Sequence, residues 1–197
     1  MAVAVVCLSH ATGAGGETIG RDVAEALGFR YVDEEILLDA ADKEGLEPEA
    51  LESIEQRRTG LGRFQVDVVT GGAFDELLRA LIRDAVVEAA DKGDVVIVAH
   101  AGAMALAGDP RVLRVLVTAS PETRAQRLAD IAGIDKADAE RAIDETDKGR
   151  AAYIRNFYGV TRELPTHYDL VVNTDRISTR QAVSLICEAT YAIEETA

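Results

Sequence analysis

Residues 9–20 read SHATGAGGETIG, and this stretch decides which fold the chain can adopt. The Val-rich apolar run 2–8 precedes it and predicts a parallel strand that is buried on both faces. Residues 17–27 follow with apolar side chains at helical spacing, and Gly28 is expected to end that helix. A glycine-rich loop between a strand and a helix lets successive N–H groups surround an anion at the positive end of the helix. Three glycines in four positions exceed what a tight turn needs, so the stretch predicts phosphate binding.

Strand-like and helix-like segments alternate along the rest of the chain. Further strands are predicted at 29–32, 94–99, 112–118 and 168–173, and helices at 74–89, from 121, at 137–157 and from 178. About five strands separated by helical crossovers indicate an α/β fold with a parallel sheet wrapped on both faces. Ligands of such sheets bind at the carboxyl ends of the strands. With 197 residues, the chain is expected to form a single domain, 1–197.

Composition excludes some classes of partner. The chain carries 21 Lys and Arg residues against 35 Asp and Glu residues, a formal net charge of −14. Such a charge repels polyanions, so neither nucleic acid nor an anionic membrane is expected as a partner, whereas small phosphate-bearing molecules remain candidates. Cys7 and Cys187 have no metal-binding spacing and indicate buried thiols in a reducing compartment. Because no export signal or long apolar run is present, we expect a cytoplasmic protein.

Two nucleotide-binding motifs come close to the glycine loop. A dinucleotide fingerprint needs G-x-G-x-x-G with an acid about 20 residues later; Asp33 fits, but Thr18 stands where the third glycine belongs. A P-loop needs G-x-x-x-x-G-K-[ST]; here His10 replaces the first glycine and Gly16 replaces the lysine. The variant of this motif found in nucleoside monophosphate kinases, with one residue between lysine and threonine, accommodates Gly13 and Thr18. The expected phosphate-binding residues are Gly13, Ala14, Gly15, Gly16, Glu17 and Thr18.

Motifs beyond this loop resemble those of one known family. They are Tyr31-Val-Asp33-Glu34-Glu35-Ile36, Ala119-Ser120-Pro121-Glu122-Thr123-Arg124, Asp144-x-x-Asp147-x-x-Arg150-x-x-Tyr153, Phe157-Tyr158-Gly159-Val160 and the stretch from Tyr168 to Ser178. With Ser9, the loop glycines and Ile19-Gly20, they make most of the chain similar to the cytidylate kinase-like branch of P-loop kinases. The resemblance implies a three-layer α/β/α P-loop kinase fold, with an acceptor-side insert at 34–72 and a helical lid at about 133–163. It also implies Mg²⁺-dependent phosphoryl transfer from ATP to a nucleoside monophosphate, CMP or dCMP.

Departures from the family pattern remove positive charge. Branch members commonly lack the P-loop lysine, as this chain does at Gly16, but Glu17 also stands where the branch usually has an arginine. His100 takes the place of the arginine that follows the third strand and binds the monophosphate. Because phosphoryl transfer depends on neutralising charge, a working kinase must supply replacements elsewhere.

The candidates for this charge are arginines in the later part of the chain. The resemblance places Arg124 and Arg127 at the start of the helix after a core strand, and Arg150 and Arg155 on the lid together with Asp147. An equally open interpretation is that these are solvated helical arginines paired with nearby aspartates.

Three further residues are candidates for the metal and the substrate. Thr18 can offer its hydroxyl to Mg²⁺ in the first helical turn. Asp33 and His100 follow strand ends and are candidates for substrate binding, with Asp33 also placed to act behind the metal. Each has a structural alternative: a first-turn hydroxyl for Thr18, a helix cap for Asp33 and a hydrogen-bonded core histidine for His100.

Three functions remain open from the sequence. The first is an ATP-dependent nucleotide or small-metabolite kinase that works without the P-loop lysine. The second is a nucleotide-binding or anion-binding protein that kept the fold and lost turnover, which Gly16 and Glu17 suggest. The third, a dinucleotide-binding oxidoreductase, is disfavoured because Thr18 breaks the fingerprint. The polar stretch 45–72 is open to two interpretations, an acceptor-binding insert or a dimer arm, so homo-oligomerisation is undecided.

Overall fold

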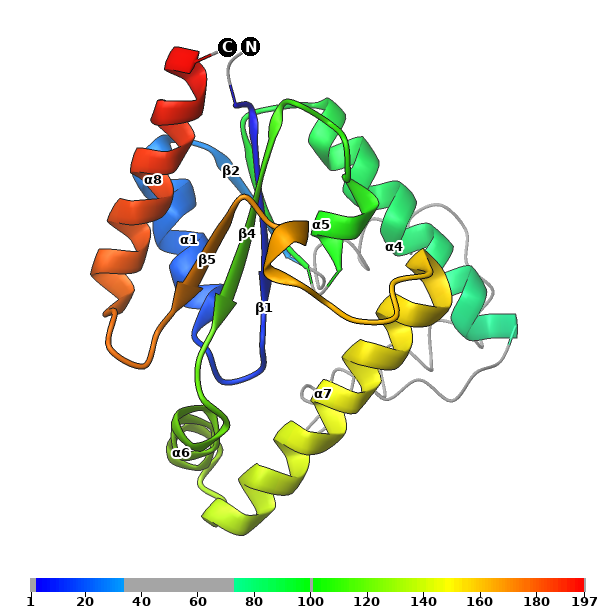
Figure 1. Ribbon diagram of the computed structural model, residues 1–197, viewed down its shortest axis with the longest axis vertical. Helices are drawn as coiled ribbons and strands as arrows, with labels where there is room; N and C mark the ends of the chain where they lie inside the picture. The colour runs from blue at the N-terminus through cyan, green and yellow to red at the C-terminus, as the bar shows by residue number, and fades with distance from the viewer. Residues whose placement is uncertain (1–2, 34–72, 100, 197) are drawn as a thin grey trace.

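The computed structural model describes residues 3–33, 73–99 and 101–196 of the chain (Figure 1). At its centre is a sheet of five parallel strands in the order β2-β3-β1-β4-β5. The strands are β1 (Val5–His10), β2 (Arg30–Asp33), β3 (Val95–Val98), β4 (Val112–Thr118) and β5 (Leu170–Asn173). Each strand forms from one of the apolar runs identified in the sequence, so the predicted parallel sheet is confirmed.

Helices cover both faces of this sheet, which gives three layers. The helices are α1 (Gly16–Leu27), α4 (Ala73–Asp91), α5 (Gly102–Ala105), α6 (Pro121–Ala132), α7 (Lys136–Tyr158) and α8 (Thr179–Thr196), with a 3-10 turn, η2, at Pro165–His167. Figure 1 shows α1 and α8 on one face and α4 and α5 on the other. The four predicted helices after the first are confirmed within one or two residues, whereas the single turn α5 was not predicted. The stretch 34–72 and His100 lie outside the described residues.

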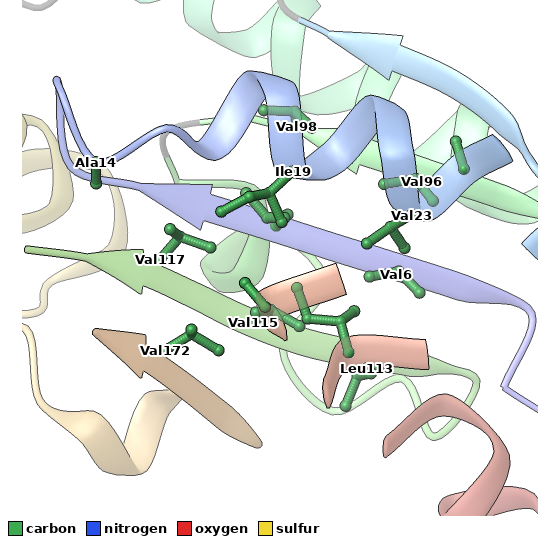
Figure 2. Packing of buried hydrophobic residues seen from close by; sticks show 14 of the residues in the cluster. Val6, Ala14, Ile19, Val23, Val96, Val98, Leu113, Val115, Val117 and Val172 are labelled. Atoms are coloured by element: carbon green, nitrogen blue, oxygen red, sulfur yellow. The ribbon is translucent and has the colours of Figure 1, made fainter. Parts of the chain in front are cut away.

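The strand period divides the buried side chains of β1 between two hydrophobic clusters. Val6 and Leu8 face α1 and α8 and pack with Ile19 and Ile186, in the cluster shown in Figure 2. Cys7 points to the opposite face and belongs to the cluster under α4. Burying a large aliphatic side chain contributes roughly 1.5–3 kcal/mol, so these two clusters hold the helices on the sheet. Burial also raises the pKa of the Cys7 thiol to about 12, which keeps it neutral.

The helices α6 and α7 form a hairpin with a small hydrophobic core of its own. Leu128 on α6 and Ile143 on α7 belong to this third cluster, which is separate from the two clusters on the sheet. Side chains cap both helices at their N-termini: Ser120 accepts a hydrogen bond from the Thr123 N–H, and Asp135 accepts one from the Asp138 N–H. This cluster and these caps hold α6 and α7 together.

All five strands run in the same direction, so their carboxyl ends lie at one edge of the sheet. In Figure 1 this is the lower edge, where β1 leads into α1 and β4 leads into α6. The fold thereby places the glycine loop, the Ser120 cap and the α6–α7 hairpin on the same side of the molecule. Among the described residues, no helix is both long enough and apolar enough to span a bilayer.

Candidate functional site

The loop between β1 and α1 has the backbone geometry that its glycines allow. Gly13 and Gly15 have φ angles of 79° and 85°, a left-handed region that favours glycine. A Cβ on Gly13 would also lie 2.7 Å from the carbonyl oxygen of Arg124, closer than Cβ atoms are found in proteins. The N–H of Ala14 donates to the Ala11 carbonyl over 2.9 Å and closes the turn. Gly13 therefore lets the loop run directly against α6.

The N-terminus of α1 differs from those of α6 and α7, because no side chain caps it. Its N-cap residue is Gly15, which has no side chain to accept a hydrogen bond from the first N–H groups of the helix. Glu17 and Thr18 are exposed in the first turn. Since the first N–H groups of a helix have no partner within the helix and carry partial positive charge, they can bind an anion. The predicted loop residues, from Gly13 to Thr18, thus lie together at the carboxyl edge of the sheet.

A threonine from the other end of the chain braces this loop. Thr174, directly after β5, is 4% exposed, and its Oγ1 donates to the carbonyl oxygen of Ala14 over 3.0 Å. The guanidinium of Arg127 donates to Oγ1 of Thr174 over 2.9 Å and to its carbonyl oxygen over 2.7 Å. Arg127, predicted to neutralise phosphate charge, is therefore placed as a support of the loop. Thr174 was not singled out from the sequence, although it lies in the stretch from Tyr168 to Ser178 that carries the family resemblance.

Two predicted site residues, Arg124 and Asp147, meet beside the glycine loop. Arg124 donates to both carboxylate oxygens of Asp147, from Nη1 over 2.9 Å and from Nη2 over 2.6 Å. Its Nη1 also lies 3.4 Å from the carbonyl oxygen of Thr12. The Arg124 side chain is 5% exposed and that of Asp147 is 42% exposed. The ion pair thus joins α6, α7 and the loop, and it crosses between helices instead of following helical i, i+4 spacing.

A second buried ion pair holds the C-terminal half of α7. Arg150 donates to the two carboxylate oxygens of Glu163 over 2.6 and 3.0 Å, and to the hydroxyl of Tyr168 over 3.2 Å. Burial acts to raise the pKa of Glu163, but the hydrogen bonds and charge of Arg150 outweigh it and lower the pKa. Burial raises the pKa of Tyr168, so its hydroxyl stays protonated. Arg155, the other predicted lid arginine, is exposed in the last turn of α7.

Asp33 ends β2 beside a cationic side chain of α1. The Arg21 guanidinium lies 3.3 Å from Oδ2 of Asp33 and 4.6 Å from the centre of the Tyr31 ring. Burial, together with the neighbouring Asp33 carboxylate, raises the pKa of the Tyr31 hydroxyl. Asp33 thus stands at a strand end, as predicted, with its charge shared by an arginine that the sequence analysis did not select. The other predicted substrate residue, His100, lies outside the described residues.

The described residues offer few side-chain ligands for a metal ion. Within the described ranges, no group of three or more His, Cys, Asp or Glu side chains could hold a metal ion. Magnesium in phosphoryl-transfer sites is commonly bound through one or two protein groups, with phosphate oxygens and water completing the shell. Thr18, which the sequence predicted for that role, is exposed in the first turn of α1.

Comparison with known proteins agrees with this geometry. The model of the cytidylate kinase-like family matches residues 5–176. A cytidylate kinase of Methanopyrus kandleri is 27% identical over 191 residues, which cover 92% of this chain and 90% of the relative. A crystal structure of an uncharacterized protein from Eubacterium ventriosum has a TM-score of 0.73 at 15% identity, with 95% of this chain and 98% of that chain covered.

The fold is also that of established small-molecule kinases. A gluconokinase from Sinorhizobium meliloti superimposes with a TM-score of 0.60 at 13% identity, over 100% of this chain and 97% of that chain. At this identity the likeness shows a shared fold, the three-layer α/β architecture of P-loop kinases. The matched segment 5–176 contains the glycine loop, the Arg124–Asp147 pair and the Thr174 brace. The chain belongs to the cytidylate kinase-like family.

Proposed function

We propose that this protein transfers the γ-phosphoryl group of ATP to a nucleoside monophosphate, with CMP and dCMP as its acceptors. The observation that carries the proposal is the uncapped start of α1 behind the left-handed Gly13 and Gly15. This arrangement suits a polyphosphate because several N–H donors converge on one point at the edge of the sheet. Membership of the cytidylate kinase-like family supports this class of acceptor.

In such a reaction an oxygen of the acceptor's phosphate attacks the γ-phosphorus of ATP. A new P–O bond forms while the bond between the γ-phosphorus and the β,γ-bridging oxygen breaks, and ADP leaves with that electron pair. Little covalent chemistry is required of the protein, so its contribution is positioning and charge neutralisation. Bound Mg²⁺ would supply further neutralisation of the phosphate oxygens, with Thr18 as its protein ligand.

We propose roles for the other predicted site residues from where they lie in the fold. Arg124 and Asp147 hold the α6–α7 hairpin against the loop, and the buried guanidinium of Arg124 contacts the loop at the Thr12 carbonyl. We propose the segment 133–163 as the lid. Arg155 is exposed on it, whereas Arg150 is fixed to Glu163 and positions α7. On the acceptor side, the proposed residues are Asp33 and His100.

A non-catalytic nucleotide-binding role is the second candidate. It is favoured by the pairing of Arg124 with Asp147 and of Arg150 with Glu163, because carboxylates already neutralise these charges. A kinase that used these arginines on the transferred phosphoryl group would have to exchange their carboxylate partners for phosphate oxygens during turnover. A binding protein has no need to do so.

One experiment separates the two. Purified protein is incubated with magnesium ATP and a panel of nucleoside monophosphates, phosphoryl transfer is followed by phosphorus NMR, and ATP affinity is measured by calorimetry. A kinase forms ADP and a nucleoside diphosphate only when its acceptor is present. Thr18→Ala should lower turnover roughly tenfold or more, while Thr18→Ser keeps the hydroxyl and should retain it. ATP binding without transfer to any acceptor would favour the binding protein.

A further inference from the structure

The peptide that joins Ala14 to Gly15 lies where the glycine loop passes from the buried part of the molecule to its surface. Ala14 is 1% exposed, whereas Gly15, the N-cap of α1, is exposed. The carbonyl oxygen of Ala14 accepts the 3.0 Å hydrogen bond from Oγ1 of Thr174. Because the C=O and N–H groups of a trans peptide point in opposite directions, this hydrogen bond turns the N–H of Gly15 away from Thr174.

Protein atoms fill the side of the loop that the Ala14 carbonyl faces. Arg127 on α6 donates to both Oγ1 and the carbonyl oxygen of Thr174. The carbonyl oxygen of Arg124 stands 2.7 Å from the place of a Cβ on Gly13, so the loop also lies directly against α6. A ligand therefore approaches the loop from the opposite side, which is the side toward which the N–H of Gly15 points.

The single proton of the Thr174 hydroxyl is available for the loop. Oγ1 of Thr174 lies 3.0 Å from the Ala14 carbonyl oxygen and 3.2 Å from that of Thr118. The Thr118 carbonyl already accepts the backbone N–H of Thr174 over 2.8 Å. A hydroxyl both accepts and donates, and Arg127 donates to this oxygen, so the proton is left for a carbonyl, of which that of Ala14 is the nearer.

The backbone at position 15 does not itself select the orientation of this peptide. Turning the peptide over changes ψ of Ala14 and φ of Gly15, and it exchanges the directions of the C=O and N–H groups. Glycine adopts positive and negative φ about equally, so the observed φ of 85° has no intrinsic advantage. In the reversed orientation a carbonyl oxygen would face an incoming phosphate and repel it. The hydrogen bond from Thr174 favours the orientation that an anion needs.

We infer that Thr174 is a positioning residue for phosphate binding: its hydroxyl holds the Ala14–Gly15 peptide so that the N–H of Gly15 donates to the polyphosphate of a bound nucleoside triphosphate. The inference rests on the proposed function, because it concerns the same phosphate site. Thr174 itself does not touch the ligand. Its hydrogen bonds to the loop and to Arg127 also link the direction of a loop donor to the position of α6.

The first test is calorimetry with inorganic tripolyphosphate, which reports on the phosphate site without the base. Thr174→Val should weaken binding roughly 3- to 10-fold, the factor by which one hydrogen bond of ordinary net strength can bias two orientations. Thr174→Ser keeps the hydroxyl and should bind within about twofold of the unaltered protein. The matched control is Thr190→Val, which removes a hydroxyl that is equally buried, on α8, and should leave the affinity unchanged.

A thermal unfolding scan of each variant shows whether it is folded. Should Thr174→Val fail to fold, Thr174→Ala and Thr174→Ser supply the same comparison, because they differ from each other only in the hydroxyl. Equal affinities of the variants with and without the hydroxyl would overturn the inference. So would an equal loss of affinity in Thr190→Val, since the effect would then follow general destabilisation.

The second test observes the donor directly by 1H–15N NMR. In the unaltered protein, saturating tripolyphosphate should shift the amide proton of Gly15 downfield, as expected for a new hydrogen bond to a phosphate oxygen. Thr174→Val should reduce that shift, and Thr174→Ser should restore it. A Gly15 amide that does not respond in protein that binds tripolyphosphate would contradict the inference.

Failure of the inference can be told apart from failure of the proposed function. If the unaltered protein binds tripolyphosphate and transfers phosphoryl groups while Thr174→Val behaves in the same way, only the role of Thr174 is wrong. If the unaltered protein binds neither tripolyphosphate nor ATP, both the role of Thr174 and the proposed function are wrong.

Discussion

Replacing Asp147 with alanine tests whether the α6–α7 hairpin is tied to the glycine loop by an ion pair. The change removes both hydrogen bonds of the Arg124 guanidinium to the carboxylate, at 2.6 and 2.9 Å. Arg124 would keep only the 3.4 Å contact with the Thr12 carbonyl, and its buried Nε already has no hydrogen-bond partner among the described residues. The variant thus leaves a buried cation with almost no compensation.

The magnitude follows from the burial of the two partners. Breaking a fully buried ion pair costs roughly 3–5 kcal/mol. Here Arg124 is 5% exposed but Asp147 is 42% exposed, so water can replace part of what the carboxylate supplies. We therefore expect a loss of about 2 kcal/mol in the free energy of unfolding, between the values for exposed and buried pairs. For a chain of this length that corresponds to a fall in the unfolding midpoint of roughly 4–8 °C.

Urea unfolding followed by circular dichroism measures this loss, with Asp144→Ala as the matched control. Asp144 lies on the same helix and pairs with Lys148, but both side chains are mostly exposed, so its removal should cost less than about 0.5 kcal/mol. A double-mutant cycle with Arg124→Ala should recover a coupling energy of more than about 1 kcal/mol. If Asp147→Ala and Asp144→Ala are equally stable, the ion pair does not hold the hairpin and the reasoning is refuted.

Three further predictions concern the loop and the acid stability of the fold. Thr174→Val removes the hydroxyl that braces the glycine loop, so it should weaken ATP binding and also lower stability. Thr190→Val loses a comparable buried hydroxyl on α8 and should lower stability alone. Calorimetry with ATP and thermal unfolding of both variants decide this. Because the folded-state pKa of Glu163 is lowered, its ion pair with Arg150 stabilises the fold above the unfolded pKa of 4.5, and this stabilisation is lost as pH falls through the lower folded pKa. Glu163→Gln should therefore lose stability less steeply than the unaltered protein between pH 4.5 and the pH of acid unfolding. Gly13→Ala should cost more stability than Gly133→Ala in urea unfolding, because both have positive φ but only Gly13 has a carbonyl oxygen 2.7 Å from the new Cβ; equal costs would mean that the loop moves away freely.

The sequence predicts the framework of this protein well because local patterns determine it. Strands buried on both faces require continuous apolar runs such as residues 5–8, and α6 begins where Ser120 and Pro121 provide a cap and a preset first turn. The glycine loop is visible for the same reason, since its backbone conformation needs glycine at positions 13 and 15. These features depend on neighbouring residues.

The contacts that build the site depend on residues distant in sequence, and the sequence alone did not reveal them. Thr174 reaches Ala14 across 160 positions, which is decided by the place of β5 beside β4 in the sheet. Arg124 was expected either to bind phosphate or to pair with a helical neighbour, and its pairing with Asp147 on another helix became visible only when the hairpin was folded. The lack of room for a side chain at Gly16 likewise depends on how closely His10 at the end of β1 approaches the first turn of α1.

Phosphorus NMR of the purified protein with magnesium ATP and CMP tests the proposed function most directly. The proposal predicts new resonances of ADP and CDP that grow together and require both substrates, with a faster rate for CMP or dCMP than for the other nucleoside monophosphates. An unchanged ATP spectrum with every acceptor, in protein that is folded and binds ATP by calorimetry, would contradict the kinase and leave a nucleotide-binding protein on a kinase fold.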